Sequence, residues 1–486
     1  MEQSLARKET TKQSETLSRV IFEWEYADFF TIGNSLQSVL ILGETGSAKT
    51  TSSGAMLAGH YLRNGYGMLF TTCKEDEVER IKKYCKAYGR EKDLVIFSPN
   101  SGEYFNWLEE EISRQDKGKG IAHNIADVLK TIIKAGNSDG QESDKAFWDS
   151  SLSQLLDNAV DLMLLTGNKK FEHIYQIIQS APRNNEQLNN AKWLESSKCC
   201  VLMKHVASNL KSQDKTPETD KLARRLSRIE DFFYDSWVNL SPRTRSIVEQ
   251  MFFSFGSRFM SDPLYSLFSG KTTVKPEDTI KGKIIVLDLP IMIYDKIGRD
   301  CQLLWKFLWM RAMQRRVIDN LSRPCVIFID EFQYFVDIEK DVQFQSTCRS
   351  YRACSVYITQ NLPNFYIQAG GSEKGKIRFK ALAGNISTKF FHTNSDPETN
   401  EFASELIGKD WQWSANEGKT LGENISFSSG QSETLQYIVD PSAFTKLKTG
   451  GSENDFCAEA IVHRQGKIFN TTGSNYKKVT LKQILL

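Results

Sequence analysis

The sequence predicts an α/β protein in which a mostly parallel sheet is covered by helices on both faces and interrupted by an all-helical insertion. Short apolar runs rich in branched residues recur along the 486-residue chain, and each is typical of a buried parallel strand. Most of these runs are separated by segments with helical periodicity, which is the alternation that such a sheet requires. The middle of the chain differs, because it carries helical patterns and few strand-like runs.

The elements follow in a definite order. The first buried strand is expected within residues 38–43, and a helix follows from Lys49 to about Leu62. Further strands are expected within residues 67–73, 93–99, 283–290, 325–332, 354–361 and 458–465. These elements form one domain from residues 21–140 and 271–486, after a polar, disordered N-terminus of residues 1–20.

The helical insertion is assigned to residues 141–270, where long amphipathic patterns replace the strands. Polar clusters at residues 212–220 and 270–282 are expected to be a surface loop and a linker back to the sheet.

Composition excludes several classes of protein. Charged residues make up 25% and hydrophobic residues 40%, unlike a mainly disordered or fibrous chain. The net charge of +2 argues against a uniformly basic nucleic-acid binder, although a locally basic groove is allowed. Nine scattered cysteines favour reduced thiols in a cytoplasmic protein over a zinc site or disulfides. The polar start is no signal peptide, and no apolar run approaches the ~20 residues that span a bilayer.

The segment GETGSAKTT lies between an expected strand and an expected helix, as a phosphate-binding loop must. Its backbone N–H groups would surround the phosphates of a nucleotide, with Lys49 on the β- and γ-phosphates and the Thr50 hydroxyl on Mg²⁺. Thr51 could touch the α-phosphate. The candidate nucleotide contacts are Gly43, Glu44, Thr45, Gly46, Ser47, Ala48, Lys49, Thr50 and Thr51. The alternative is a Gly/Ser-rich turn that precedes a lysine by chance.

Ala48 departs from the usual pattern, which has glycine immediately before the lysine. Its Cβ could crowd a loop that folds tightly around phosphate. We therefore expect nucleotide binding to survive, and leave the rate of turnover open.

Three further residues follow two neighbouring expected strands. CVIFIDEF brings Asp330 and Glu331 to the C-terminal end of a strand, where ligands bind in open α/β sheets. Asp330 would hold the Mg²⁺ shell, and Glu331 would polarise the attacking water as general base. Gln360 ends the next strand, where its carboxamide could bind the γ-phosphate or orient water. Each residue alone is also typical of polar surface, so their order after the phosphate loop carries the assignment.

Arg349 and Arg352 lie three residues apart in a stretch with a helical pattern, and therefore on one helix face. Either could be an arginine finger that enters a neighbouring subunit and stabilises charge in the transition state. The alternative is a solvated basic helix face.

A basic segment at residues 370–385 follows a flexible glycine pair and includes Phe379. Its charged residues fall at every second position: Lys374, Lys376, Arg378 and Lys380. The segment could line a pore and grip nucleic-acid phosphates while the ring stacks on a base. It could equally be a mobile basic surface loop.

With these motifs in hand, the chain resembles the coupling-protein ATPases of type IV secretion and conjugation, members of the HerA/FtsK class of hexameric translocases. The likeness covers most of the chain, and rests also on CKEDEVER, SPNSGEYFNWL, DKAFWDSSLSQLL, LAGNISTKFFHTNSDPETNEFASELIG and VDPSAFTKLKTGG. It implies a RecA-like nucleotide-binding domain interrupted by a helical domain, in a ring of six with ATP at subunit boundaries. It also favours Arg349 over Arg352, because family members place their trans-acting arginine at that spacing. Membrane-bound members begin with transmembrane helices, whereas no apolar run long enough to span a bilayer precedes residue 38 here, so the resemblance does not extend to docking on a secretion channel.

Three functions are therefore weighed. The first is a cytoplasmic, ATP-hydrolysing homo-hexamer that uses ATP and Mg²⁺ to translocate single- or double-stranded DNA. The second keeps the motor but has the helical insertion recognise a protein or nucleoprotein for a secretion system or a defence effector. The third is a switch that binds ATP without hydrolysing it, because of Ala48, and controls assembly with a partner. Glu331 and Gln360 favour the two motors over the switch.

Overall fold

The computed structural model describes residues 16–114, 121–136, 142–420 and 426–485, and confirms the predicted fold class. Every strand expected from the sequence is present in a nine-stranded sheet. In spatial order the sheet consists of β13 (Tyr476–Lys482), β12 (Cys457–Arg464), β9 (Thr388–Phe391), β3 (Val39–Leu42), β8 (Ala353–Thr359), β7 (Cys325–Ile329), β4 (Gly67–Phe70), β6 (Ile284–Leu287) and β5 (Leu94–Phe97). Residues 1–15 of the expected disordered N-terminus lie outside the described residues, and Val20 already belongs to a strand.

The central strands explain why the site forms where it does. β3 runs parallel to β8 on one side and to β9 on the other, and β7 runs parallel to β8 and β4. All residues of β3, β7 and β8 are buried, as expected for parallel strands that are covered on both faces. The carboxyl ends of three neighbouring strands therefore meet at one edge of the sheet.

The far edge of the sheet departs from the expected parallel pattern. β12 is antiparallel to β9 and to β13, and of these three strands the sequence had indicated only β12. β9 was missed because its run, TKFF, begins with two polar residues that the fold buries, Thr388 and Lys389.

The chain divides into two compact units. The first comprises Met1–Val95, Thr279–Val286 and Arg316–Leu486, and the second Ile96–Asp278 and Leu287–Arg315. Besides its part of the sheet, the first unit contains β1 (Val20–Glu23), β2 (Phe29–Thr31), α2 (Ile32–Ser35), α3 (Ala55–Arg63), α4 (Asp76–Ala87), α16 (Ile338–Thr347), α17 (Leu362–Gln368), α18 (Ser372–Gly384) and α19 (Pro397–Ile407). β1 and β2 form a separate antiparallel pair.

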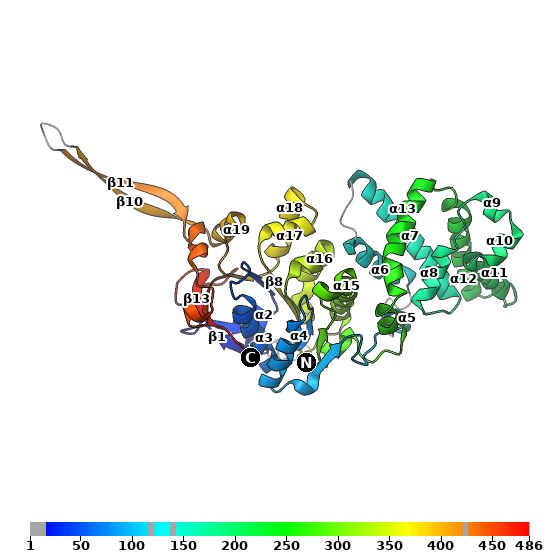
Figure 1. Cartoon of the computed structure of the whole chain (residues 1–486), viewed down its shortest axis with the longest axis horizontal. Helices are drawn as coiled ribbons and strands as arrows, with labels where there is room; N and C mark the ends of the chain where they lie inside the picture. Colours follow the sequence, from blue (N-terminus) through cyan, green and yellow to red (C-terminus); the bar gives the residue numbers. More distant parts are fainter. Residues whose placement is uncertain (1–15, 115–120, 137–141, 421–425, 486) are drawn as a thin grey trace, which may run out of the picture. The chain divides into compact units, whose positions relative to one another are not determined.

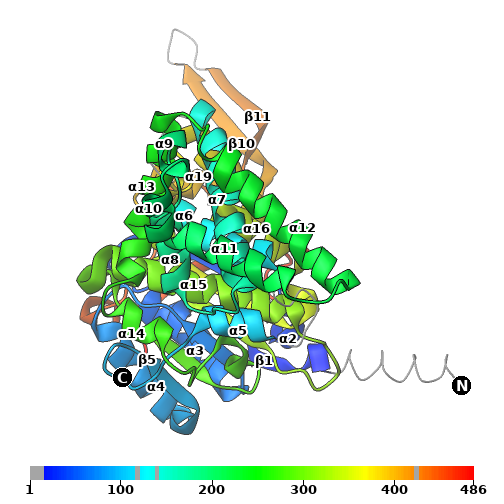
Figure 2. The same ribbon diagram turned by 90° about the vertical axis from the view of Figure 1, so that its right-hand side faces the viewer.

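The second unit is helical, and its helices begin before the residue expected from the sequence. It contains α5 (Trp107–Ser113), α6 (Ala122–Gly136), α7 (Glu142–Leu165), α8 (Phe171–Gln179), α9 (Asn185–Leu188), α10 (Ala191–Ser196), α11 (Lys198–Lys211), α12 (Pro217–Asp231), α13 (Pro242–Phe259), α14 (Leu264–Ser269) and α15 (Ile291–Arg315). Figure 2 shows α11 and α12 side by side. The expected loop at 212–220 is shorter, because the Thr216 capping box and Pro217 start α12 within it.

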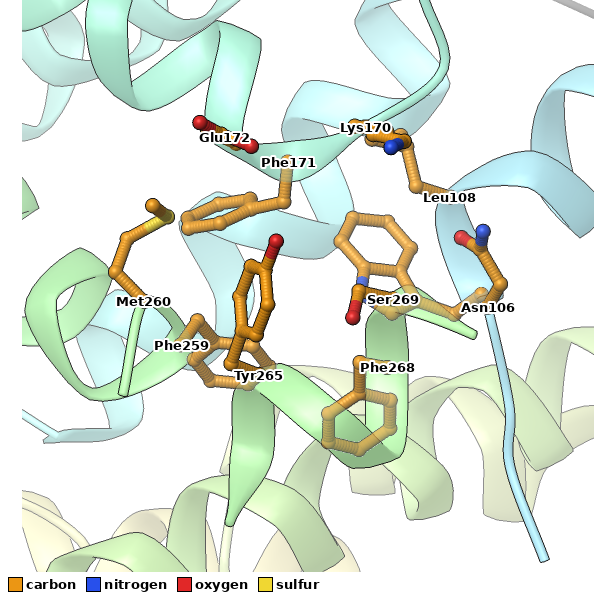
Figure 3. Close-up of a pocket in the computed structure, with 11 residues that line it drawn as sticks. Asn106, Leu108, Lys170, Phe171, Glu172, Phe259, Met260, Tyr265, Phe268 and Ser269 are labelled. Atoms are coloured by element: carbon orange, nitrogen blue, oxygen red, sulfur yellow. The ribbon is translucent and has the colours of Figure 1, made fainter. Parts of the chain in front are cut away.

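An aromatic pocket lies inside the second unit (Figure 3). The rings of Phe171, Phe259, Tyr265 and Phe268 surround it. Lys170 and Glu172 are the charged residues among those lining it. This lining suits an apolar group and is unsuited to a triphosphate.

A long hairpin extends from the end of α19 in the first unit (Figure 1). It consists of β10 (Lys409–Thr420) and β11 (Ser426–Tyr437), which pair only with each other. Near its base, Trp411 and Trp413 are 60% and 68% exposed, and Leu435 lies opposite Trp411. One face of the hairpin base is therefore apolar and exposed.

Candidate nucleotide-binding site

The phosphate-loop segment follows β3, as expected, and folds back on itself within one turn. Gly43 has no space for a side chain, because an added Cβ would lie 2.7 Å from both Ser47 Oγ and His392 Cβ. Gly46 has a φ of +86°, which a glycine adopts without strain. The helix that follows begins with a π-helical turn, Thr50–Gly54, and continues as α3. The predicted arrangement of strand, loop and helix is confirmed.

Ala48 lies in the left-handed region, with a φ of +59°. The expected crowding is therefore a backbone effect, since an L-residue in this region brings its Cβ close to the following carbonyl oxygen. The usual glycine at this position would carry no such strain.

We expect Ala48→Gly to raise the free energy of unfolding by about 0.5–1 kcal/mol, because relief of strain exceeds the added entropy of the unfolded chain. Urea unfolding measures this. The matched control is Ala27→Gly, since Ala27 has a φ of +65° outside the loop. Loss of stability in Ala48→Gly, with a gain in Ala27→Gly, would contradict the strain at residue 48.

Lys49 is 7% exposed, although its side chain ends in an ammonium group. Within the described residues its Nζ has one long hydrogen bond, 3.5 Å to the carbonyl oxygen of Glu44, and no carboxylate within 4.0 Å. A nearly buried cation without a close anion is suited to binding one. The position of Lys49 therefore fits a phosphate.

Thr50 and Asp330 meet at the site, as the sequence predicts. The Thr50 hydroxyl donates a hydrogen bond of 2.9 Å to Asp330 Oδ2. A hydroxyl and a carboxylate supply the hard oxygen ligands that Mg²⁺ prefers, together with phosphates and water. Burial, and then the charge of Glu331, raises the pKa of Asp330, and a cation at this position would relieve that repulsion. The donor set therefore fits Mg²⁺.

Glu331 and Gln360 are also in contact. Gln360 Nε2 donates to both oxygens of the Glu331 carboxylate at 3.3 Å, and Gln333 Nε2 donates to Oε2 at 2.7 Å. Glu331 itself has left-handed backbone angles, φ 50° and ψ 49°, which is a costly conformation for glutamate. The two glutamines hold its carboxylate at the end of β7.

The sequence reasoning missed Glu77 and Arg80 as site residues. Both lie on α4, and Arg80 Nη2 is 3.8 Å from Asp330 Oδ2 and 3.7 Å from Glu77 Oε1. Burial raises the pKa of Glu77 to about 7, and the Asp330 carboxylate adds to this shift. The signal was in the segment CKEDEVER, which the resemblance singled out without assigning a role.

The two candidate arginines do not share a helix face, contrary to expectation. α16 ends at Thr347, and Arg349 lies in a 3₁₀ turn where its side chain is exposed. Arg352 has a φ of 52° and is 2% exposed. Because its guanidinium is enclosed by its own chain, Arg352 cannot reach another molecule.

The basic segment at 370–385 is a helix, α18, and the interpretation as a loop is wrong. Phe379 is 1% exposed and packs against Phe365 and Phe402, so it cannot stack on a base as proposed. Helical geometry divides the basic residues between two sides, with Lys374 and Arg378 on one and Lys376 and Lys380 on the other. Lys376 pairs with Glu398 at 2.9 Å, and Arg378 Nη1 donates to the carbonyl oxygen of Ala369 at 2.6 Å. The helix forms because Phe379, Leu382 and Ala383 give it a buried face.

His392 lies beneath the phosphate loop, and its Nε2 is 2.8 Å from the Ser53 hydroxyl. Burial lowers the pKa of His392 to about 3 from an ordinary value of 6.5, and the charge of Lys49 acts in the same direction. Between these values the unfolded chain binds a proton that the folded chain does not. Stability is therefore greatest above pH 6.5 and falls as the pH decreases toward 3.

Lowering the pH from 7 to 5 is expected to remove about 2 kcal/mol of stability through His392. Urea unfolding at both pH values, for the wild type and His392→Asn, measures this. The variant should lose correspondingly less on acidification. His205→Asn, which removes an exposed histidine of α11, should behave as the wild type. An equal loss in His392→Asn and wild type would contradict the assignment.

Comparison with known proteins finds one matching family model and several solved structures of similar fold. Residues 324–449 match the family model described as the TraM recognition site of TraD and TraG. The fold is similar to unbound TrwBdeltaN70, a bacterial conjugative coupling protein, with a TM-score of 0.56, 14% identity, and coverage of 98% of this chain and 92% of that one. The TM-score is 0.56 for TrwB with a GTP analogue, at 15% identity, and 0.55 for TrwB with ADP and Mg²⁺, at 14% identity. Both matches cover 98% of this chain and 93% of the TrwB chain. A comparison with curated proteins found no match.

The resemblance to coupling proteins that the sequence predicted is thereby confirmed. Among the described residues, no helix has the length and apolar character needed to cross a membrane.

Proposed function

We propose that this chain is an ATP-hydrolysing motor of the coupling-protein type, which works as a homo-hexamer and moves DNA or a nucleoprotein. One observation carries the proposal: Lys49, Thr50, Asp330, Glu331 and Gln360 converge at the carboxyl ends of β3, β7 and β8. The similarity to TrwB, a coupling protein whose structure was determined with ADP and Mg²⁺, supports a nucleotide with Mg²⁺ at this position.

Each residue has a distinct role in the proposed reaction. Lys49 and the N–H groups of residues 43–51 bind the phosphates and hold the γ-phosphoryl group in place. Thr50 and Asp330 hold Mg²⁺, which when bound supplies positive charge to the β- and γ-phosphates. Glu331 accepts a proton from the attacking water, and Gln360 orients that water and the Glu331 carboxylate.

The ring is proposed because Arg349 is exposed and its guanidinium has no partner among the described residues. An arginine finger needs such freedom, since it completes the site of a neighbouring subunit. The cytoplasm is the proposed compartment, because all nine cysteines are free thiols and eight of them are buried.

The proposal is tested by measuring ATP turnover with and without single- and double-stranded DNA at low salt, where phosphate contacts are strongest. DNA-stimulated turnover is expected. Turnover that saturating DNA of both forms leaves unchanged would exclude DNA as the cargo.

A protein or nucleoprotein cargo is the second candidate, and one observation favours it. The family model that matches residues 324–449 is described as the TraM recognition site of TraD and TraG. We therefore propose that a protein partner binds this region. Turnover without DNA stimulation, but raised by such a partner, would support this version.

The third candidate, a switch that does not hydrolyse ATP, rests on Ala48. Its backbone strain does not displace Lys49 or Thr50 from the site, so we favour hydrolysis. Turnover that is abolished by Lys49→Ala would exclude the switch.

A further inference from the structure

The end of the chain returns to the phosphate loop. Gln483, the first residue after β13, donates from Nε2 to Thr51 Oγ1 at 2.8 Å. The next residue, Ile484, donates its backbone N–H to the Thr51 carbonyl oxygen at 2.8 Å. Thr51 is therefore tied through both its side chain and its backbone to a segment more than 430 residues away.

A diglycine turn, Gly450 and Gly451, packs against Gln483 and the phosphate loop. Gln483 Oε1 accepts the Gly451 N–H at 2.6 Å. At Gly450, an added Cβ would lie 2.5 Å from Gln483 Oε1 and 3.0 Å from Ala48 Cβ. Both glycines have positive φ, 84° and 75°. The turn therefore lies directly against the phosphate loop, and a side chain at Gly450 would crowd Gln483 and Ala48.

Phe456 lies beside Gln483 and the diglycine turn, and it has an unusual backbone conformation. Asp455 and Phe456 are consecutive left-handed residues, with φ values of 52° and 55°. This conformation is strained for a bulky aromatic residue, and such strain is concentrated at ligand-binding and catalytic sites. Phe456 donates its N–H to the Gly451 carbonyl oxygen at 2.8 Å and accepts the Gln483 N–H at 2.7 Å. The residue is nevertheless 43% exposed.

We expect a nucleoside on the side of the loop where these contacts lie. Lys49 and Thr50 serve the β- and γ-phosphates and Mg²⁺, so the next residue along the helix, Thr51, lies nearest the α-phosphate. The ribose and base extend beyond the α-phosphate, toward whatever surrounds Thr51. In this chain that surrounding is the cluster of Gly450, Gly451, Phe456 and Gln483.

We propose that this cluster is the nucleoside-binding half of the site, in which the exposed ring of Phe456 stacks on the base and Gln483 positions Thr51 for the α-phosphate. The inference rests on the proposed binding of a nucleoside triphosphate. Stacking uses the π-face that every base has, so the site accepts adenine and guanine with similar affinity.

The test separates the nucleoside from the phosphates. Isothermal titration of the full-length protein with Mg²⁺-ATP, Mg²⁺-GTP and Mg²⁺-tripolyphosphate compares ligands with and without a nucleoside. Phe456→Asn removes the ring and keeps the backbone, because asparagine tolerates left-handed angles. We expect it to weaken ATP and GTP binding about tenfold and to leave tripolyphosphate binding unchanged. Asp455→Asn, at the adjacent left-handed residue, should bind all three ligands as the wild type does.

Each other result overturns the inference in a recognisable way. If Phe456→Asn binds ATP as tightly as wild type, the base lies elsewhere. If it loses affinity for tripolyphosphate as well, and melts at a lower temperature, Phe456 supports the fold only. If the wild-type protein binds neither ATP nor tripolyphosphate, both this inference and the proposed nucleotide-dependent function fail.

Discussion

Replacing Glu331 by glutamine is expected to lower the rate of ATP turnover by about a thousandfold while ATP still binds. Two carboxylates follow β7, those of Asp330 and Glu331. Asp330 accepts the hydrogen bond of Thr50, so the substitution removes the carboxylate that is left to accept a proton. Gln333 and Gln360 now donate to that carboxylate, and a glutamine amide can satisfy only part of this arrangement. Steady-state turnover and titration with ATP measure the two effects separately.

The control for this variant is Glu339→Gln, which makes the same change of charge on the exposed surface of α16. It should retain wild-type turnover. Lys49→Ala should behave differently from both, since loss of the phosphate-binding ammonium prevents binding itself. If Glu331→Gln keeps more than about a tenth of the wild-type rate, another base acts, and the candidate is Glu77 on α4, since Arg80 lies close to both Glu77 and Asp330.

The sequence predicts which residues of the candidate site come together, because they are fixed by local pattern and strand order. Buried apolar runs identify β3, β7 and β8, and parallel strands place their carboxyl ends at one edge of the sheet. Asp330 and Thr50 could thus be expected to meet, although they are 280 residues apart.

Residues that join the site through long-range packing could not be predicted in the same way. Glu77 reaches Asp330 only through the docking of α4, and Gln483 reaches Thr51 only because β12 and β13 are antiparallel at the sheet edge. No local motif encodes either contact. The diglycine turn at Gly450 was visible in the sequence, but its fit against Ala48 depends on the fold.

The basic segment shows how a pattern of one residue type can mislead. Lys and Arg at every second position suggested either a pore-lining segment or a mobile surface loop, whereas the apolar residues Phe379, Leu382 and Ala383 have helical spacing. Burial of those three residues decides the conformation of α18, because solvated lysines gain little from any particular backbone.

Arg349→Ala is expected to lower turnover by about a thousandfold and to leave the stability of the protein unchanged. The side chain is exposed and makes no hydrogen bond or ion pair within the described residues, so its removal is expected to cost the isolated fold little. A loss of activity would therefore arise in an assembly. Arg352→Met should keep its turnover, because the 2% exposed Arg352 cannot reach a second subunit.

Mixing two inactive variants distinguishes a finger that acts between subunits from a residue that acts within one. In a mixed ring, an Arg349→Ala subunit retains Lys49 and binds ATP, and a neighbouring Lys49→Ala subunit supplies the missing Arg349. Turnover should therefore reappear on mixing and rise with protein concentration, since the complete site exists only in the assembly. If the mixture stays as inactive as its components while each variant still assembles, Arg349 serves its own subunit. In that case the exposed 3₁₀ turn after α16 would have to move onto the site of its own chain during the reaction.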